Sequence, residues 1–461
     1  MPKYIYSYLD QLNAAPDRWS IGLRLFFESN DGISKFYGLR LVRDFLSSSS
    51  LSSVAPEIRS QIKNSLMVFI QDSLKTDRIL ELFIKNSLVT IVTLCIKFDF
   101  PELWPTAFVD ILSLARIGSS AFSSVAGLDI AVGILSELDV EVVAYNIDRT
   151  QEEVAHNIVV KDALRDGPLC KEVMTFLCSS VVSSRQEGHV EMSEKCLRVL
   201  AQMIGWTDVN LTVSCALSTV YQALQDAELR GAACTCLFEV AKKGMDPISK
   251  LQLINSIGLV QWLVAVPIAG ATGVGLSGED DEDDGTAAEL GPLVDILFCE
   301  LLGMWLGYEK VQTGYDESQA SSSSTAKNDP VRAKTSGNSK ASVGAAGADV
   351  GSALTVDAAP VAAAMLRALM PSLMGLFGHP QSDVYASVTT ALNKLIMLLK
   401  QQTALRGAGG LAGVSAETGY FLAEDYLTEL LSAIYKQLQY APDFKFDVDD
   451  EDDSAVIEVS E

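Results

Sequence analysis

Apolar residues recur at helical spacing along most of the chain. In one stretch they form a broad stripe on one helical face, which Pro101 then interrupts: Ile79, Leu82, Phe83, Leu88, Ile91, Val92, Cys95 and Ile96. Strand-like alternation of apolar and polar residues is nearly absent. The pattern predicts an all-α protein built of amphipathic helices.

The predicted helices pair off at intervals near the ~40–47 residues of a HEAT-type repeat. Each pair buries its apolar face only against its neighbours, so about seven to eight stacked hairpins predict a curved HEAT-repeat superhelical solenoid. The predicted helices are residues 4–28, 33–46, 58–74, 78–98, 101–117, 125–143, 152–182, 191–204, 211–224, 228–243, 247–264, 290–307, 360–377, 382–402 and 421–439.

The run Lys242-Lys243-Gly244-Met245-Asp246-Pro247 combines the end of one helix with the start of the next. The lysines suit the negative end of a helix dipole, and Gly244 can take the left-handed conformation without a Cβ clash. Asp246 can accept the free N–H groups of a new first turn, while Pro247 at its first position loses no hydrogen bond. We therefore predict a helical hairpin with a very short turn.

Several segments break the helical series. Residues 268–288 are Gly-rich and contain six consecutive acidic residues, 279–284, which must be solvated. Residues 312–359 are rich in Ser, Ala and Gly and are predicted to be disordered. The expected organisation is repeats at 1–120 and 121–267, an acidic linker at 268–288, a HEAT helix at 289–311, a disordered insertion at 312–359, repeats at 360–446 and an acidic tail at 447–461.

Composition narrows the class of protein. The chain has 461 residues, 48% of them hydrophobic and 20% charged, which suits a repeat array with a continuous apolar core. Its net charge of −24 argues against a generic phosphate-binding surface and for basic protein partners, although a local basic patch is compatible with it. The eight cysteines, without a Cys-x-x-Cys motif, are interpreted as reduced core thiols of a cytosolic or nuclear protein.

Membrane insertion and secretion are not expected. Residues 251–278 carry no charge, but polar residues recur within them, Pro267 interrupts them and glycines fill their second half, so we predict a buried helix and a linker. The N-terminus lacks the basic and apolar regions of a signal peptide.

The sequence also lacks the usual signatures of catalysis. Its three histidines are scattered, no phosphate-binding or dinucleotide-binding glycine motif is present, and the acidic run lacks the spacing of a calcium loop. We predict no enzyme activity, no catalytic residue, no metal site and no cofactor.

Binding is the more promising kind of chemistry, because a solenoid presents a long surface lined by one helix of each pair. Lys161 and Arg165 lie four residues apart on one predicted helix and so share a face that could contact phosphates or an acidic partner. The alternative is that they are solvated charges paired with Asp162 or Asp166.

Two further clusters lie near the start of predicted helices. One is Lys35, Phe36 and Tyr37, and the other is Lys85 and Asn86. For both, a surface charge beside a core aromatic residue is an equally good interpretation.

Several runs, taken together and in order, resemble the tRNA exportins, the exportin-T family of the importin-β (karyopherin) superfamily. The resemblance covers about residues 4–267 and returns weakly at 435–446. The similar runs are residues 35–39, 83–86, 103–105, 108–112, 137–139, 157–165 and 232–247.

This resemblance implies a nuclear export receptor that binds tRNA cooperatively with Ran-GTP and crosses the nuclear pore by contacts with Phe-Gly nucleoporins. Such a receptor shuttles between nucleus and cytoplasm, is expected to be monomeric, and releases its cargo when GTP is hydrolysed. Residues 1–120 would be the Ran-binding module. By match of motif, Lys35, Phe36, Lys85 and Asn86 are the Ran-binding candidates.

In the same way, the resemblance makes Lys161 and Arg165 the tRNA-binding candidates. Two departures limit it, because the Gly- and Ala-rich segments between 268 and 360 are foreign to the family pattern and the chain stops before the family's C-terminal arch. We therefore expect a C-terminally truncated receptor. The alternative function is a karyopherin-like HEAT scaffold that binds only protein partners.

Overall fold

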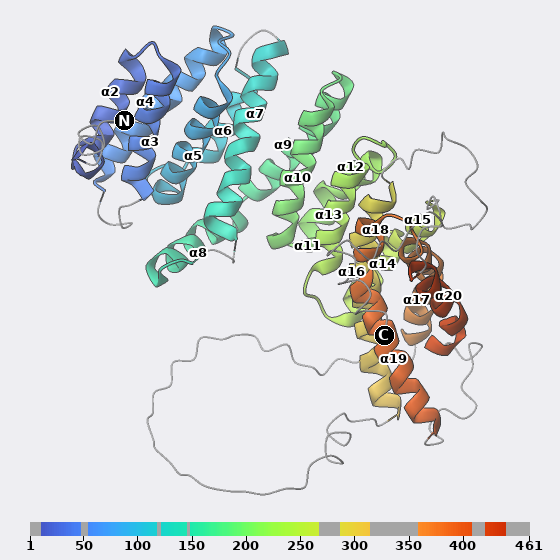
Figure 1. The fold of residues 1–461 in the computed structure, drawn as a ribbon. Helices are drawn as coiled ribbons and strands as arrows, with labels where there is room; N and C mark the ends of the chain where they lie inside the picture. Colours follow the sequence, from blue (N-terminus) through green and yellow to red (C-terminus); the bar gives the residue numbers. More distant parts are fainter. Residues whose placement is uncertain are drawn as a thin grey trace, which may run out of the picture. The chain divides into compact units, whose positions relative to one another are not determined.

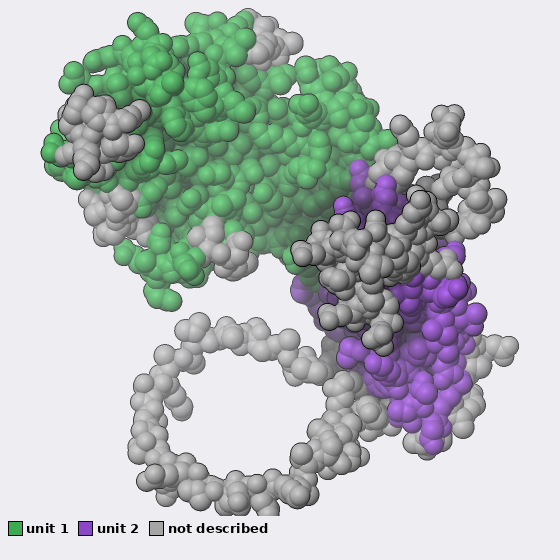
Figure 2. Space-filling view, in the orientation of Figure 1, with its two compact units in different colours: residues 1–243 green, residues 244–461 purple. Residues whose placement is uncertain are grey.

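The computed structural model describes residues 11–47, 54–117, 121–144, 148–266, 286–313, 358–407 and 420–438 (Figure 1). All the regular secondary structure in these ranges is helical, and no β-strand occurs in them. The helices form two compact units, residues 1–243 and 244–461 (Figure 2). The prediction of an all-α, HEAT-type array is confirmed, whereas most of the predicted linkers, insertion and tail lie outside the described residues.

Unit 1 is a two-layer array. In the first layer α3, α5, α7, α10 and α13 pack side by side in that order, and α2, α4, α6, α9 and α12 of the second layer each pack on the helix that follows them. The helices are α2 (Arg18–Glu28), α3 (Gly32–Ser47), α4 (Pro56–Lys75), α5 (Leu82–Asp99), α6 (Ala107–Leu114), α7 (Ala121–Leu138), α8 (Gln151–Arg165), α9 (Leu169–Gln186), α10 (Val190–Trp206), α11 (Val209–Cys215), α12 (Leu217–Ala223) and α13 (Arg230–Lys242).

Two glycines set the close approach of the first two helices of this array. A Cβ atom on Gly38 of α3 would lie 2.5 Å from the carbonyl oxygen of Gly22 on α2, and one on Gly22 would lie equally close to the carbonyl oxygen of Gly38. Any side chain there would force the backbones apart. Gly38 belongs to one of the runs that carry the exportin resemblance. Its close approach to Gly22 shows that it has a packing role.

Three predicted helices of unit 1 are divided in the structure. Residues 152–182 form α8 and α9, because Gly167 and Pro168 interrupt the helix. Residues 211–224 form α11 and α12 with a break at Ala216. The predicted helix 4–28 is interrupted at Ala15 and Pro16, before α2 begins at Arg18.

The turn after α13 matches the sequence prediction only in its second half. Asp246 caps α14 by accepting hydrogen bonds from the backbone N–H groups of Ile248 and Ser249, and Pro247 opens the helix, as predicted. Gly244 does not adopt the left-handed conformation; instead Lys243 ends α13 in an extended conformation (φ −55°, ψ 134°). The boundary between the two units falls here, between Lys243 and Gly244.

Unit 2 is organised around α16 and α17, which pack on each other and on α15, α18, α19 and α20. The predicted single helix 247–264 is divided, because Gly258 adopts a left-handed conformation (φ +66°) between α14 and α15. The helices are α14 (Pro247–Ser256), α15 (Leu259–Ala265), α16 (Thr286–Thr313), α17 (Ala359–Phe377), α18 (Ser382–Ala386), α19 (Thr389–Gly407) and α20 (Leu427–Gln437).

Two helices in the described part of unit 2 are long and apolar enough to cross a membrane, judged by length and composition alone. They are Ala287–Tyr308 in α16 and Ala359–Phe377 in α17, and more than half of each is buried within the protein. Two carboxylates in α16 have partners: Glu300 pairs with Lys250 at 2.5 Å, and Asp295 accepts a hydrogen bond from the Ala391 N–H at 2.7 Å. That no membrane is entered stays a prediction.

Candidate functional site

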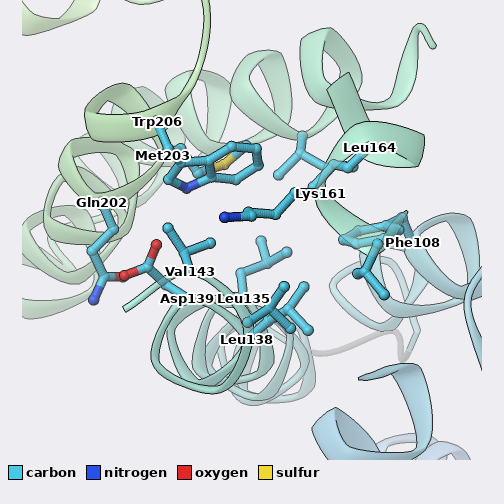
Figure 3. A pocket seen from close by; sticks show the side chains of 13 residues that line it. Phe108, Leu135, Leu138, Asp139, Val143, Lys161, Leu164, Gln202, Met203 and Trp206 are labelled. Carbon is cyan, nitrogen blue, oxygen red and sulfur yellow. The ribbon is translucent and has the colours of Figure 1, made fainter. Parts of the chain in front are cut away.

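A pocket lies where α7, α8 and α10 meet in unit 1 (Figure 3). Its volume is about 30 Å³, room for about one water molecule, which is far smaller than a typical small-molecule site. We name it the Trp206 pocket. Its lining residues are Phe108, Leu135, Leu138, Asp139, Val142, Val143, Val160, Lys161, Leu164, Val173, Gln202, Met203 and Trp206.

Local sequence features shape two walls of the pocket. α7 continues into one π-helical turn, Asp139–Val143, which places Asp139 and Val142 on the pocket side. α8 begins with a reciprocal capping box, in which Thr150 accepts the Glu153 N–H and the Glu153 carboxylate accepts the Thr150 N–H. This cap fixes the start of the helix that carries both tRNA-binding candidates.

Lys161 extends into the Trp206 pocket, towards Trp206 and Asp139 (Figure 3). Burial raises the pKa of the Asp139 carboxyl, while the positive charge of Lys161 acts in the opposite direction. The aliphatic stem of Lys161 therefore lies among apolar side chains. Its ammonium group interacts electrostatically with the half-buried carboxylate of Asp139.

Arg165 also contacts Trp206. Its guanidinium donates a 2.6 Å hydrogen bond to the Trp206 carbonyl oxygen and lies 5.5 Å from the centre of the indole ring. It is also 3.8 Å from Asp162, one of the acidic neighbours named in the alternative interpretation. Lys161 and Arg165 thus lie on one face of α8 as predicted, but both are engaged within unit 1.

The Ran-binding candidates lie on two adjacent helices of the first layer. Phe36 of α3 packs edge-on against Phe83 of α5, with ring centres 5.6 Å apart, and Lys35 is half-buried on the same turn. Asn86 of α5 is exposed. The structure thus brings the two sequence clusters together on adjacent helices. That these residues bind Ran stays a prediction.

Lys85 is the candidate whose surroundings the sequence does not suggest. It forms an ion pair with Asp129 of α7, and Asp129 also pairs with Lys195 of α10. The lysine side chains are 21% and 37% exposed, and that of Asp129 is 18% exposed, so all three are half-buried. Neither Asp129 nor Lys195 was identified from the sequence, because they lie 44 and 110 residues from Lys85 along the chain.

Groups suited to metal binding are not concentrated in any described region. Within those ranges no three His, Cys, Asp or Glu side chains are placed to hold a metal ion together. All eight cysteines are free, and all but the half-buried Cys215 are buried. The Trp206 pocket is not the largest in unit 1, because a pocket of about 440 Å³ is lined by residues of α9, of α12 and of the turn after α12.

Comparison with protein families identifies the array. A family model described as exportin 1-like protein matches residues 81–237, which run from the start of α5 into α13. The chain contains an exportin-like domain. This domain includes the Trp206 pocket and the ion-paired Lys85, whereas Lys35 and Phe36 precede it.

Curated relatives extend the similarity beyond the exportin-like domain. The chain is 28% identical to exportin-T of Danio rerio over 309 residues, which are 66% of this chain and 30% of that protein. It is 26% identical to exportin-T of Homo sapiens over 256 residues, 54% of this chain and 26% of that protein. The resemblance to the exportin-T family is therefore confirmed, and the chain spans less than a third of the length of these relatives.

Proposed function

We propose that this chain acts as a karyopherin-type nuclear export receptor that binds tRNA together with Ran-GTP. It would cross the nuclear pore by contacts with Phe-Gly nucleoporins, shuttle between nucleus and cytoplasm, and release its cargo on GTP hydrolysis. One observation carries the proposal: the exportin 1-like match, residues 81–237, coincides with the layered helices α5 to α13. The similarity to proteins named exportin-T supports the tRNA assignment.

The Ran-binding site is assigned to the first helix layer. Lys35 and Phe36 on α3 adjoin Asn86 and Lys85 on α5, and the Phe36–Phe83 contact holds the two helices in register. An exposed amide and two half-buried lysines beside an aromatic pair are compatible with a protein-binding surface. Binding should depend on the nucleotide, so the proposal predicts a clear preference for GTP-bound over GDP-bound Ran.

The tRNA site is assigned to α8. A shape-reading contact with an RNA backbone needs a few well-placed cations, which Lys161 and Arg165 would supply. Their engagement with Asp139 and Trp206 favours the alternative, a scaffold that binds only proteins. The two functions differ in cargo, and this difference can be measured.

The deciding experiment is an electrophoretic mobility shift of mature tRNA by the full chain, with and without Ran locked in its GTP state. We expect a shift that strengthens when Ran-GTP is present, and we expect Lys161→Glu/Arg165→Glu to weaken it without changing Ran affinity. Lys171→Glu, an exposed lysine on α9, is the control for the change of charge. Binding of Ran-GTP without any tRNA shift would support the protein-only scaffold instead.

A further inference from the structure

A pocket of unit 1 that has no part in the proposed function lies between α9 and α12, two helices of the second layer that contact each other. We name it the α9–α12 pocket. Its volume is about 440 Å³, which falls within the range of about 300–1,000 Å³ that is typical of ligand pockets. None of the Ran-binding or tRNA-binding candidates lines it.

The floor of this pocket is apolar. Val181 of α9, Ala223 of α12 and Leu229 of the turn before α13 line it, and these residues are only 2–3% exposed. The half-buried Val182 and the exposed Ala227 extend the apolar lining towards the surface. An apolar group of a ligand would displace water from this lining favourably, so the floor suits an apolar side chain.

The rim of the pocket carries a cluster of ion pairs. Arg185, in the last turn of α9, pairs with Asp226, and its guanidinium also lies 2.9 Å from the carboxylate of Glu228. The Asp226 carboxylate accepts a 3.1 Å hydrogen bond from the Glu228 N–H, which fixes the turn that carries both acids. The three side chains are 37%, 22% and 60% exposed, so a partner can reach them from solvent.

The charge balance of this rim favours a cation. Two carboxylates share one guanidinium, so Arg185, Asp226 and Glu228 together carry a net charge of about −1 at neutral pH. Glu187 and Arg230, the next charged residues after Arg185 and after Glu228 along the chain, offset each other. The C-terminal turn of α9 also lines the pocket, and a helix C-terminus adds partial negative charge.

We propose that the α9–α12 pocket docks a segment of a protein partner in which an apolar side chain stands next to a lysine or an arginine. The apolar side chain enters between α9 and α12, and the cation joins Asp226 and Glu228 at the rim. The net charge of −24 of the whole chain favours partners of this charge. The inference goes beyond the proposed function and does not depend on it.

A nucleic acid or an acidic peptide fits this pocket less well. Its phosphates or carboxylates would face Asp226 and Glu228, while the guanidinium of Arg185 is already shared between these two acids. A basic segment without an apolar side chain would leave the buried floor in contact with water. Both parts of the ligand are therefore needed, and each can be tested separately.

The test measures the fluorescence anisotropy of a labelled peptide with one leucine between two pairs of lysines, titrated with the full chain at physiological salt. Two matched peptides carry serine in place of the leucine, or glutamates in place of the lysines. Ala227→Trp fills the pocket, and Glu228→Lys reverses one charge at its rim. Ala155→Trp on α8 and Glu102→Lys in the turn before α6 make the same changes at exposed positions outside the pocket. Circular dichroism and thermal unfolding would confirm that all four variants fold.

We expect saturable binding of the leucine peptide, which Ala227→Trp and Glu228→Lys each weaken by about tenfold or more while the two controls stay within about twofold of the unchanged chain. The serine peptide should bind about fivefold more weakly or worse, and the glutamate peptide should not bind. If the leucine peptide does not bind, or binds both pocket variants as tightly as the unchanged chain, the inference is overturned. Equal binding of the serine and leucine peptides would reveal only a general attraction to an acidic protein and would overturn it as well. Ala227→Trp should leave Ran-GTP and tRNA binding unchanged, so a failure of this inference leaves the proposed function standing.

Discussion

The ion pair between Arg59 of α4 and Asp99 of α5 allows a quantitative prediction about the array. Their side chains are 7% and 3% exposed, and the guanidinium nitrogen lies 2.7 Å from the carboxylate oxygen. Arg59 also donates a hydrogen bond to the Val54 carbonyl oxygen. The pair therefore connects the two helices of one repeat from inside the protein.

Asp99→Ala would leave the Arg59 guanidinium buried without its counter-ion. At 2.7 Å and an effective dielectric constant of about 20, the attraction that is lost amounts to about 6 kcal/mol. Relaxation and entry of water recover part of this, so we expect the free energy of unfolding to fall by about 3–5 kcal/mol. Replacing both partners, as in Arg59→Met/Asp99→Leu, should restore at least half of the loss, because no charge is then buried.

Urea denaturation followed by circular dichroism would measure these changes, and hydrogen exchange would show whether the loss is confined to α4 and α5. The control is Glu28→Ala, which breaks the ion pair between Arg24 and Glu28. These two side chains are 73% and 67% exposed, so losing the pair should lower the free energy of unfolding by about 0–1 kcal/mol. If Asp99→Ala costs no more than this control, the account of the buried pair is refuted.

Three further predictions concern packing, thiols and helix capping. Gly38→Ala should destabilise the protein by about 1–3 kcal/mol in urea titrations, because its Cβ would collide with Gly22, whereas Gly303→Ala, with no atom within 4 Å, should be neutral or stabilising. Burial raises the pKa of Cys95 and of Cys196 to about 12, so these thiols carry little of the thiolate that reacts with iodoacetamide. Mass spectrometry should therefore find the half-buried Cys215 labelled first, and early labelling of Cys95 would contradict this. Hydrogen bonds from Ser249 and Ile248 lower the pKa of Asp246, so the cap stabilises the folded protein above the unfolded pKa of this carboxyl and is lost as the pH falls below about 4. The melting temperatures of Asp246→Ala and of the unchanged chain should therefore differ at pH 7 and become equal in acid.

Much of the fold could be predicted because it depends on local signals. The helical spacing around Ile91, the cap at Asp246 and the proline at position 247 each act within one or two helical turns, and the structure contains all of them. The breaks at Gly167 and Gly258 were missed. A single glycine is tolerated inside many helices, and only the packed structure determines whether it ends one.

The surroundings of the candidate site could not be predicted, since they depend on contacts between distant repeats. Arg165 bonds to a carbonyl group 41 residues away, and Lys85 reaches Asp129 44 residues away. The helical spacing correctly placed Lys161 and Arg165 on one face of α8. It gave no indication that Trp206 would occupy that face.

We propose that Ran-GTP and tRNA bind this chain cooperatively. The measurement that tests this is the tRNA dissociation constant with and without saturating Ran-GTP, together with the Ran-GTP dissociation constant with and without saturating tRNA. We expect each ligand to tighten the binding of the other by the same factor, because the coupling free energy is reciprocal. If the tRNA constant is identical with and without Ran-GTP, the account of this chain as a tRNA export receptor is contradicted.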